Sequence, residues 1–175
     1  MRKLRLTRTG RGAVIAVALA LVVAAPVAAT QPTRVVRDLH PFVDPAGTAC
    51  AFDVEGQPSS GFSTKTIFSD GREMYSVHAK GAYVNMATGA RFETRDVFTE
   101  IDRFDPVTGT LVGLNDGETT SSFNPGDMGP FGVVGSNGAL YHFVGTIHYT
   151  YDTNANVFNM LAYSGTVIDV CAALS

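Results

Sequence analysis

The chain has 175 residues, of which 45% are hydrophobic and 17% are charged, with two cysteines and no tryptophan. The 146 residues that follow the expected signal peptide are enough for one domain with a buried core. They carry eight Lys and Arg residues against 16 Asp and Glu residues, a net charge of −8 without a basic cluster, which argues against nucleic acid or an anionic membrane surface as a partner.

The N-terminus has the three parts of an export signal. Met1 to Gly12 is basic and lacks acidic residues, Ala13 to Ala25 is apolar, and small residues precede a cleavage site after Ala29. The alternative is an uncleaved membrane anchor, but its apolar core would be short and interrupted by Pro26. We therefore expect residues 1–29 to be a signal peptide and the protein to be secreted, with no membrane contact after cleavage.

Residues 30–49 contain three prolines and no lasting period, which predicts an irregular lead-in with one short strand at 34–38. From Cys50 onward, runs rich in Phe, Tyr, Val, Ile and Thr alternate with turn signals, and residues 50–175 are expected to form a single β domain. The turn signals are the pairs Asp70-Gly71, Thr88-Gly89, Thr108-Gly109, Asp116-Gly117 and Asn137-Gly138.

These signals predict an all-β fold. A long surface loop is expected at residues 124–130, where two prolines and two glycines disfavour pairing with a neighbouring strand. Residues 140–152 alternate in polarity like a half-buried strand, whereas 157–172 are apolar at nearly every position, which predicts a central strand covered on both faces. The expected strands are 50–55, 61–69, 72–79, 81–87, 90–104, 110–115, 118–123, 131–135, 139–151 and 156–171.

Cys50 and Cys171, which are 121 residues apart, are expected to form one disulfide, since exported proteins rarely keep free thiols. Two free thiols or an intermolecular bridge are the alternatives. A disulfide requires Cα atoms within about 7 Å, so the first and last core strands would lie close together. A meander whose ends meet is a β-barrel or a barrel-like sandwich, here of about 8–10 strands.

No motif for metal or cofactor chemistry is present. His142 and His148 share a strand face about 20 Å apart, too far to hold one ion, and we expect all four histidines at the surface. The chain has no nucleophile elbow and no CxxC redox pair. We therefore expect no catalytic residue of known type, no metal and no cofactor.

Asp96 and Glu100 are the two candidate ligand-binding residues. Strict alternation places Asp96 on the core face between Phe92 and Phe98, and an unpaired buried carboxylate is costly. The favoured interpretation is a bulge near Asp96 that turns its carboxylate toward solvent or Arg95. The alternative is a polar cavity holding both carboxylates, with raised pKa values and an acid–base role.

Cys50 at the start of a strand, Asn124-Pro125-Gly126 in a loop and the ending Asp169-Val170-Cys171-Ala172-Ala173-Leu174 carry a resemblance. From roughly Cys50 to Leu174 the chain resembles a group of short secreted actinobacterial all-β proteins that have a terminal-to-terminal disulfide and no assigned function. The resemblance implies secretion and the disulfide, and it transfers no catalytic residue.

The favoured function is that of a secreted, monomeric, non-enzymatic binding or interaction protein, whose partner is a protein or a small molecule. The alternatives are a barrel that binds a small apolar ligand and a cofactor-independent lyase or isomerase that uses Asp96 or Glu100. A cavity larger than roughly 300 Å³ would favour both alternatives, and carboxylates inside it would favour the enzyme.

Overall fold

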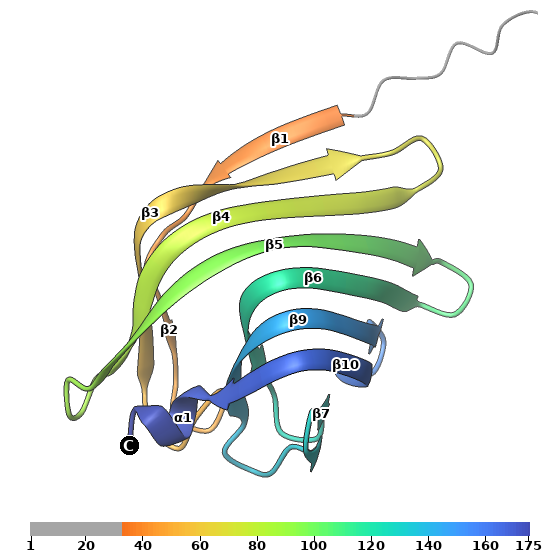
Figure 1. Ribbon diagram of the computed structural model, residues 1–175. Helices are drawn as coiled ribbons and strands as arrows, with labels where there is room; N and C mark the ends of the chain where they lie inside the picture. Colours follow the sequence, from red (N-terminus) through yellow and green to blue (C-terminus); the bar gives the residue numbers. More distant parts are fainter. Residues whose placement is uncertain (1–32) are drawn as a thin grey trace, which may run out of the picture.

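The computed structural model describes residues 33–175, so the expected signal peptide lies outside the described residues. Ten strands form one sheet in the order β1-β3-β4-β5-β6-β9-β10-β7-β8, with β2 paired to β3, and one short helix follows (Figure 1). The elements are β1 Thr33–Asp38, β2 Phe42–Asp44, β3 Val54–Ile67, β4 Arg72–Asn85, β5 Arg91–Asp105, β6 Thr110–Phe123, β7 Met128–Gly129, β8 Gly132–Val133, β9 Ala139–Asp152, β10 Val157–Asp169 and α1 Val170–Ala173.

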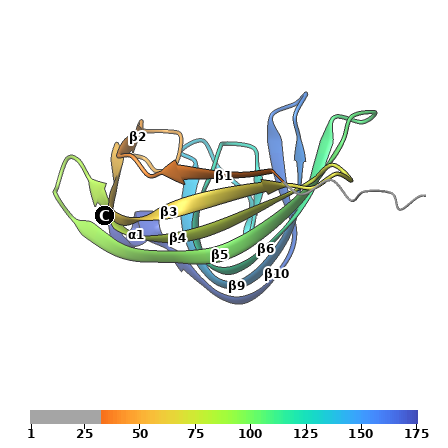
Figure 2. The ribbon, with the colours of Figure 1, turned by 90° about the horizontal axis from the view of Figure 1, so that it is seen from above.

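The all-β prediction is confirmed, but the sheet does not close into a barrel. Seen from above, the strands form a curved trough with one open side (Figure 2). The Cys50–Cys171 disulfide is present, with Cα atoms 5.6 Å apart. Closure was wrongly inferred from it because Cys50 precedes β3, an inner strand, and Cys171 lies in α1, beyond the end of β10. The disulfide therefore joins the segment before β3 to the helix after β10, although β3 and β10 are not paired in the sheet.

Four of the five expected turn pairs lie between strands, as predicted, but Asp116-Gly117 lies inside β6. β3, β4 and β6 each run for 14 residues through positions where the sequence predicts an interruption. Gly117, Gly145 and Gly165 lie opposite one another on β6, β9 and β10, each with positive φ. A Cβ on Gly145 would stand 2.0 Å from the Ser164 carbonyl oxygen, so only glycine allows the neighbouring strands to approach this closely.

Two further expectations are wrong at the C-terminal side of the sheet. β10 is an edge strand for most of its length, since beyond β9 it pairs only through Asn159 with Met128 of β7, and Leu161 is 63% exposed. Residues 124–130 are not a surface loop throughout, because they include β7 and the buried Asp127. The Asp127 carboxylate accepts hydrogen bonds from the backbone N–H groups of Asn124 and Phe158, at 2.7 and 2.8 Å.

The sheet divides between β5 and β6 into a first arm, β1 to β5, and a second arm, β6, β9 and β10 (Figure 1). β5 and β6 pair only from Val97–Glu118 to Asp105–Thr110, after which each strand stays with its other neighbour. One core joins the arms near the disulfide, and a second fills the bend of the second arm. The first consists of Ala49, Cys50, Val54, Leu140, Val170 and Leu174, and the second of Phe123, Val134, Phe143, Ile147, Tyr149 and Met160.

Candidate functional site

The expected bulge near Asp96 is absent. The β4–β5 register runs without a shift through the pair Ala79–Asp96, so Asp96 stays on the same strand face as Phe92 and Phe98. The position is tolerated because it lies one residue before Val97, where β5 and β6 separate. The gap between the arms leaves room for a cavity beside the Asp96 carboxylate, but, contrary to the alternative interpretation of the sequence, this cavity does not include Glu100.

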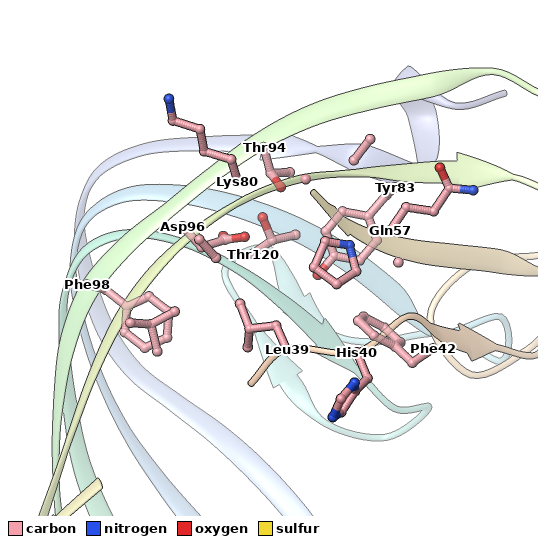
Figure 3. A pocket seen from close by; sticks show the side chains of 16 residues that line it. Leu39, His40, Phe42, Gln57, Lys80, Tyr83, Thr94, Asp96, Phe98 and Thr120 are labelled. Atoms are coloured by element: carbon pink, nitrogen blue, oxygen red, sulfur yellow. The ribbon is translucent and has the colours of Figure 1, made fainter. Parts of the chain in front are cut away.

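This first cavity has a volume of about 250 Å³ and lies between the 39–42 segment and the facing parts of β4 and β5. Its walls are mainly aromatic and aliphatic, and its polar end holds Asp96 and Thr120, whose side chains lie next to each other (Figure 3). The Lys80 side chain points away from the cavity. The residues that form the apolar walls include Leu39, Phe42, Val77, Tyr83 and Phe98.

The Asp96 carboxylate is poorly compensated in this position. Its Oδ1 atom is buried and has no hydrogen-bond partner among residues 33–175. Burial raises the pKa of Asp96, and the neighbouring Thr120, His142 and Thr94 oppose this rise only in part. Among the described residues, no Lys or Arg forms an ion pair with Asp96. One carboxylate oxygen of Asp96 therefore lacks a hydrogen bond at the polar end of a largely apolar cavity.

A buried histidine connects Asp96 to the second arm. His142 is 5% exposed, with Nδ1 2.9 Å from the Thr120 hydroxyl and Nε2 3.4 Å from Glu118 Oε1. Its ring meets the Phe92 ring edge-on, across the gap between the arms. The surface prediction for this histidine is wrong because it assigned the whole polar face of β9 to solvent, whereas the first arm covers the end of that face.

The order carboxylate, imidazole and hydroxyl at Glu118, His142 and Thr120 is that of a nucleophilic triad. Its surroundings do not suit nucleophilic attack. A nucleophile needs donors to stabilise the negative charge that develops on the substrate, and the Thr120 hydroxyl faces the Asp96 carboxylate instead. The arrangement is better suited to holding Asp96 in place than to forming a covalent intermediate.

Glu100 lies in a second cavity of about 240 Å³, which is lined by β5 and by β6, β9 and β10. The Tyr149 hydroxyl donates to Asp102 Oδ1 at 2.7 Å, and Asn115 Nδ2 donates to Glu100 Oε2 at 3.1 Å. Burial raises the pKa of Glu100 to about 7, and the adjacent Asp102 carboxylate adds to the effect. Burial also raises the pKa of Asp102.

The two candidate residues from the sequence therefore lie in separate cavities and not in one. Alternation along β5 placed both carboxylates, and Asp102 with them, on the inner face. Sequence reasoning missed Asn115 and Tyr149 as members of the second cavity, since they come from β6 and β9. The alternation over residues 140–152 is consistent with Tyr149 facing inward, but its contact with Asp102 depends on the order of the strands.

Within residues 33–175, no cluster of three or more His, Cys, Asp or Glu residues is placed to bind a metal ion. Over the same residues, no helix is long and apolar enough to cross a membrane. No protein-family model, curated protein or solved structure matches the chain. The chemistry of the two cavities is therefore the basis for assigning a function.

Proposed function

We propose that the protein is a secreted, non-enzymatic binding protein whose first cavity holds a small apolar molecule with an ammonium group. The observation that carries the proposal is the buried, unpartnered Oδ1 atom of Asp96 at one end of an aromatic cavity. A ligand N–H donor would supply the missing hydrogen bond, and a positive charge would compensate the carboxylate. The export signal and the disulfide support secretion.

The surroundings of Asp96 favour a cation over a neutral or anionic ligand. Phe42 and Tyr83 form an edge-to-face aromatic pair, with ring centroids 6.0 Å apart, and both line the cavity. Aromatic faces attract ammonium groups, most strongly where water is excluded. Asp96 and Asp44 both act on Tyr83, where they add to the effect of burial in raising the pKa of its hydroxyl.

The volume of the cavity limits the ligand. At about 250 Å³, the first cavity lies just below the roughly 300 Å³ at which ordinary ligand sites begin. We therefore propose a ligand no larger than one ring or short chain with a single charged end. A binding role uses Asp96 as an ion-pair partner and needs no group that transfers a proton or forms a bond.

Calorimetric titration of the mature, disulfide-bonded protein with benzylamine, benzyl alcohol and benzoate tests the proposal. These probes share one ring and differ in the charge of their polar end. Benzylamine should bind most tightly, and Asp96→Asn should remove that preference. Asp38→Asn, at an exposed position on β1, is the matched control and should leave it unchanged. Equal affinity for benzoate, or equal effects of both substitutions, would contradict the proposal.

A further inference from the structure

The second cavity has an unused hydrogen-bond acceptor of its own. Asn115 is 4% exposed and lines the cavity, and its Nδ2 donates to Glu100, whereas its buried Oδ1 has no partner. Beside it stand the carboxyl groups of Glu100 and Asp102, which interact with each other. The Tyr149 hydroxyl, which lies beside this pair, already donates to Asp102. The polar end of the cavity is therefore rich in acceptors and short of donors.

The nearest cation, Lys65, acts on Asp102 without forming an ion pair with it. On β4, Glu73 and Tyr75 lie opposite Asp102 and Glu100 in the register. On β3, Lys65 forms a 2.7 Å ion pair with Glu73 and lies over the Tyr75 ring, so Glu73 engages its ammonium group. On β9, Tyr149 and Tyr151 line the cavity with hydroxyl groups and add no cation.

We propose that the second cavity is a separate binding site for a small organic cation with several N–H donors, such as an aromatic amidine or guanidine. A planar amidinium group can donate to the carboxyl pair and to Asn115 Oδ1 at the same time, while its apolar part contacts the rest of the cavity. The walls opposite the carboxyl pair are Leu111, Phe123, Ile147 and Phe158. This site is independent of the first cavity, since Asp96 does not line it.

A hydrated divalent cation fits the cavity less well. In the part of the chain that the structure describes, no group of three or more His, Cys, Asp or Glu side chains is placed to hold a metal ion. Calcium takes six to eight oxygen ligands, and the cavity adds to its two carboxyl groups only one amide oxygen and the hydroxyls of Ser121, Tyr149 and Tyr151. The remaining ligands would be water molecules facing aromatic and aliphatic side chains, which cannot hydrogen-bond to them. An organic cation places its own apolar surface against these walls instead.

Protonation of Glu100 should compete with the cation. Because the pKa of Glu100 is raised to about 7, the carboxyl pair holds a proton in acid and loses it near neutral pH. A cation that binds the ionised pair displaces that proton, so its affinity should fall about tenfold for each pH unit below about 7 and level off above it. The site would thus release its ligand on acidification.

The test is titration of the mature protein with benzamidine from about pH 5 to pH 8, followed by calorimetry and by the side-chain amide NMR signals of Asn115. The Asp96→Asn background removes the preference of the first cavity for cations, so a charge-dependent signal reports the second cavity. We expect the Asn115 signals to shift and the affinity to rise about 100-fold between pH 5 and pH 8, with about half of the final affinity reached at pH 7. Neutral benzamide, which has the same shape, should bind more weakly at neutral pH and without pH dependence.

Three variants locate the effect. Glu100→Gln should abolish the pH dependence and lower the affinity at pH 8, and Asn115→Leu should lower the affinity at every pH. Glu93→Gln, on the opposite and exposed face of β5, is the matched control and should bind like the parent. A flat pH profile in the parent protein, unshifted Asn115 signals, or displacement of benzamidine by millimolar calcium would overturn the proposal. Because the pH profile needs no substitution at the site, misfolding of a variant would not leave the proposal untested.

Discussion

Replacing Glu100 by Gln should stabilise the protein at alkaline pH and leave its stability nearly unchanged in acid. Glutamine has the shape of a protonated glutamate, so it can still accept from Asn115 and can donate to the neighbouring Asp102 carboxylate. What the substitution removes is the charge that Glu100 must carry above its pKa, in a position from which water is largely excluded.

The size of the effect follows from the pKa. A carboxyl whose pKa rises on folding from 4.5 to about 7 binds its proton more tightly in the folded state, so stability is lost as pH rises through this range. One pKa unit corresponds to about 1.4 kcal/mol, which gives a loss of about 3 kcal/mol that is complete above about pH 7. In a cluster with Asp102 this value belongs to the carboxyl pair and not to Glu100 alone.

Urea unfolding of the parent protein and of Glu100→Gln at intervals from about pH 5 to pH 8 measures this difference. The two free energies of unfolding should nearly agree at the acid end and diverge by up to about 3 kcal/mol in favour of the variant at the alkaline end. The exposed control Glu93→Gln should follow the parent throughout. Parallel profiles for the parent and Glu100→Gln would refute the conclusion that Glu100 is buried as an acid.

Three further outcomes are expected. Replacing both Cys50 and Cys171 by alanine should destabilise the fold by about 2–5 kcal/mol in denaturant titrations, with reductant producing a comparable loss in the parent protein. Gly145→Ala should cost more than about 2 kcal/mol because its Cβ meets backbone, whereas Gly135→Ala, with no atom within 4 Å, should change the melting temperature little; similar losses would contradict the steric argument. The intact mass of the culture-medium product should correspond to a chain that begins at Thr30, and retention of the apolar run would show an anchor instead.

The strand content of the fold was predictable because alternation and β-rich composition are local properties of the sequence. The extent of the strands was not. Gly61 and Gly117 look like ends of strands, yet both lie within long strands with positive φ. A glycine allows a turn and a bend equally well, and the choice depends on which strand lies alongside.

The place of β10 in the sheet shows the same limit. Its apolar sequence predicts a central strand. In the structure β7 pairs with it only at Asn159, so most of β10 is at the edge of the sheet and Leu161 is exposed. An apolar sequence indicates that a strand can be buried, but it does not show that another element packs against it. The position of a strand in the sheet depends on the course of the whole chain.

Asp96 was identified from the sequence by the conflict between its charge and its place in the alternation. The sequence correctly indicates an unusual position at Asp96. The expected bulge is wrong, because the β4–β5 register is continuous and the carboxylate lines a cavity. What the sequence lacked was the separation of β5 and β6, which no local signal announces. Thr120 and His142 lie near Asp96 because β5 and β6 separate at this point.

The three aligned glycines on β6, β9 and β10 also constrain how the sequence can change over evolutionary time. Each one leaves room for the backbone of an adjacent strand, so a side chain gained at Gly145 or Gly165 would press on the other's strand. If one of these glycines were lost, the three strands could no longer bend together at this point, and the other two glycines would no longer be needed there. Descendants of this chain should therefore retain Gly117, Gly145 and Gly165 together or lose them together, while the cavity walls diverge around them.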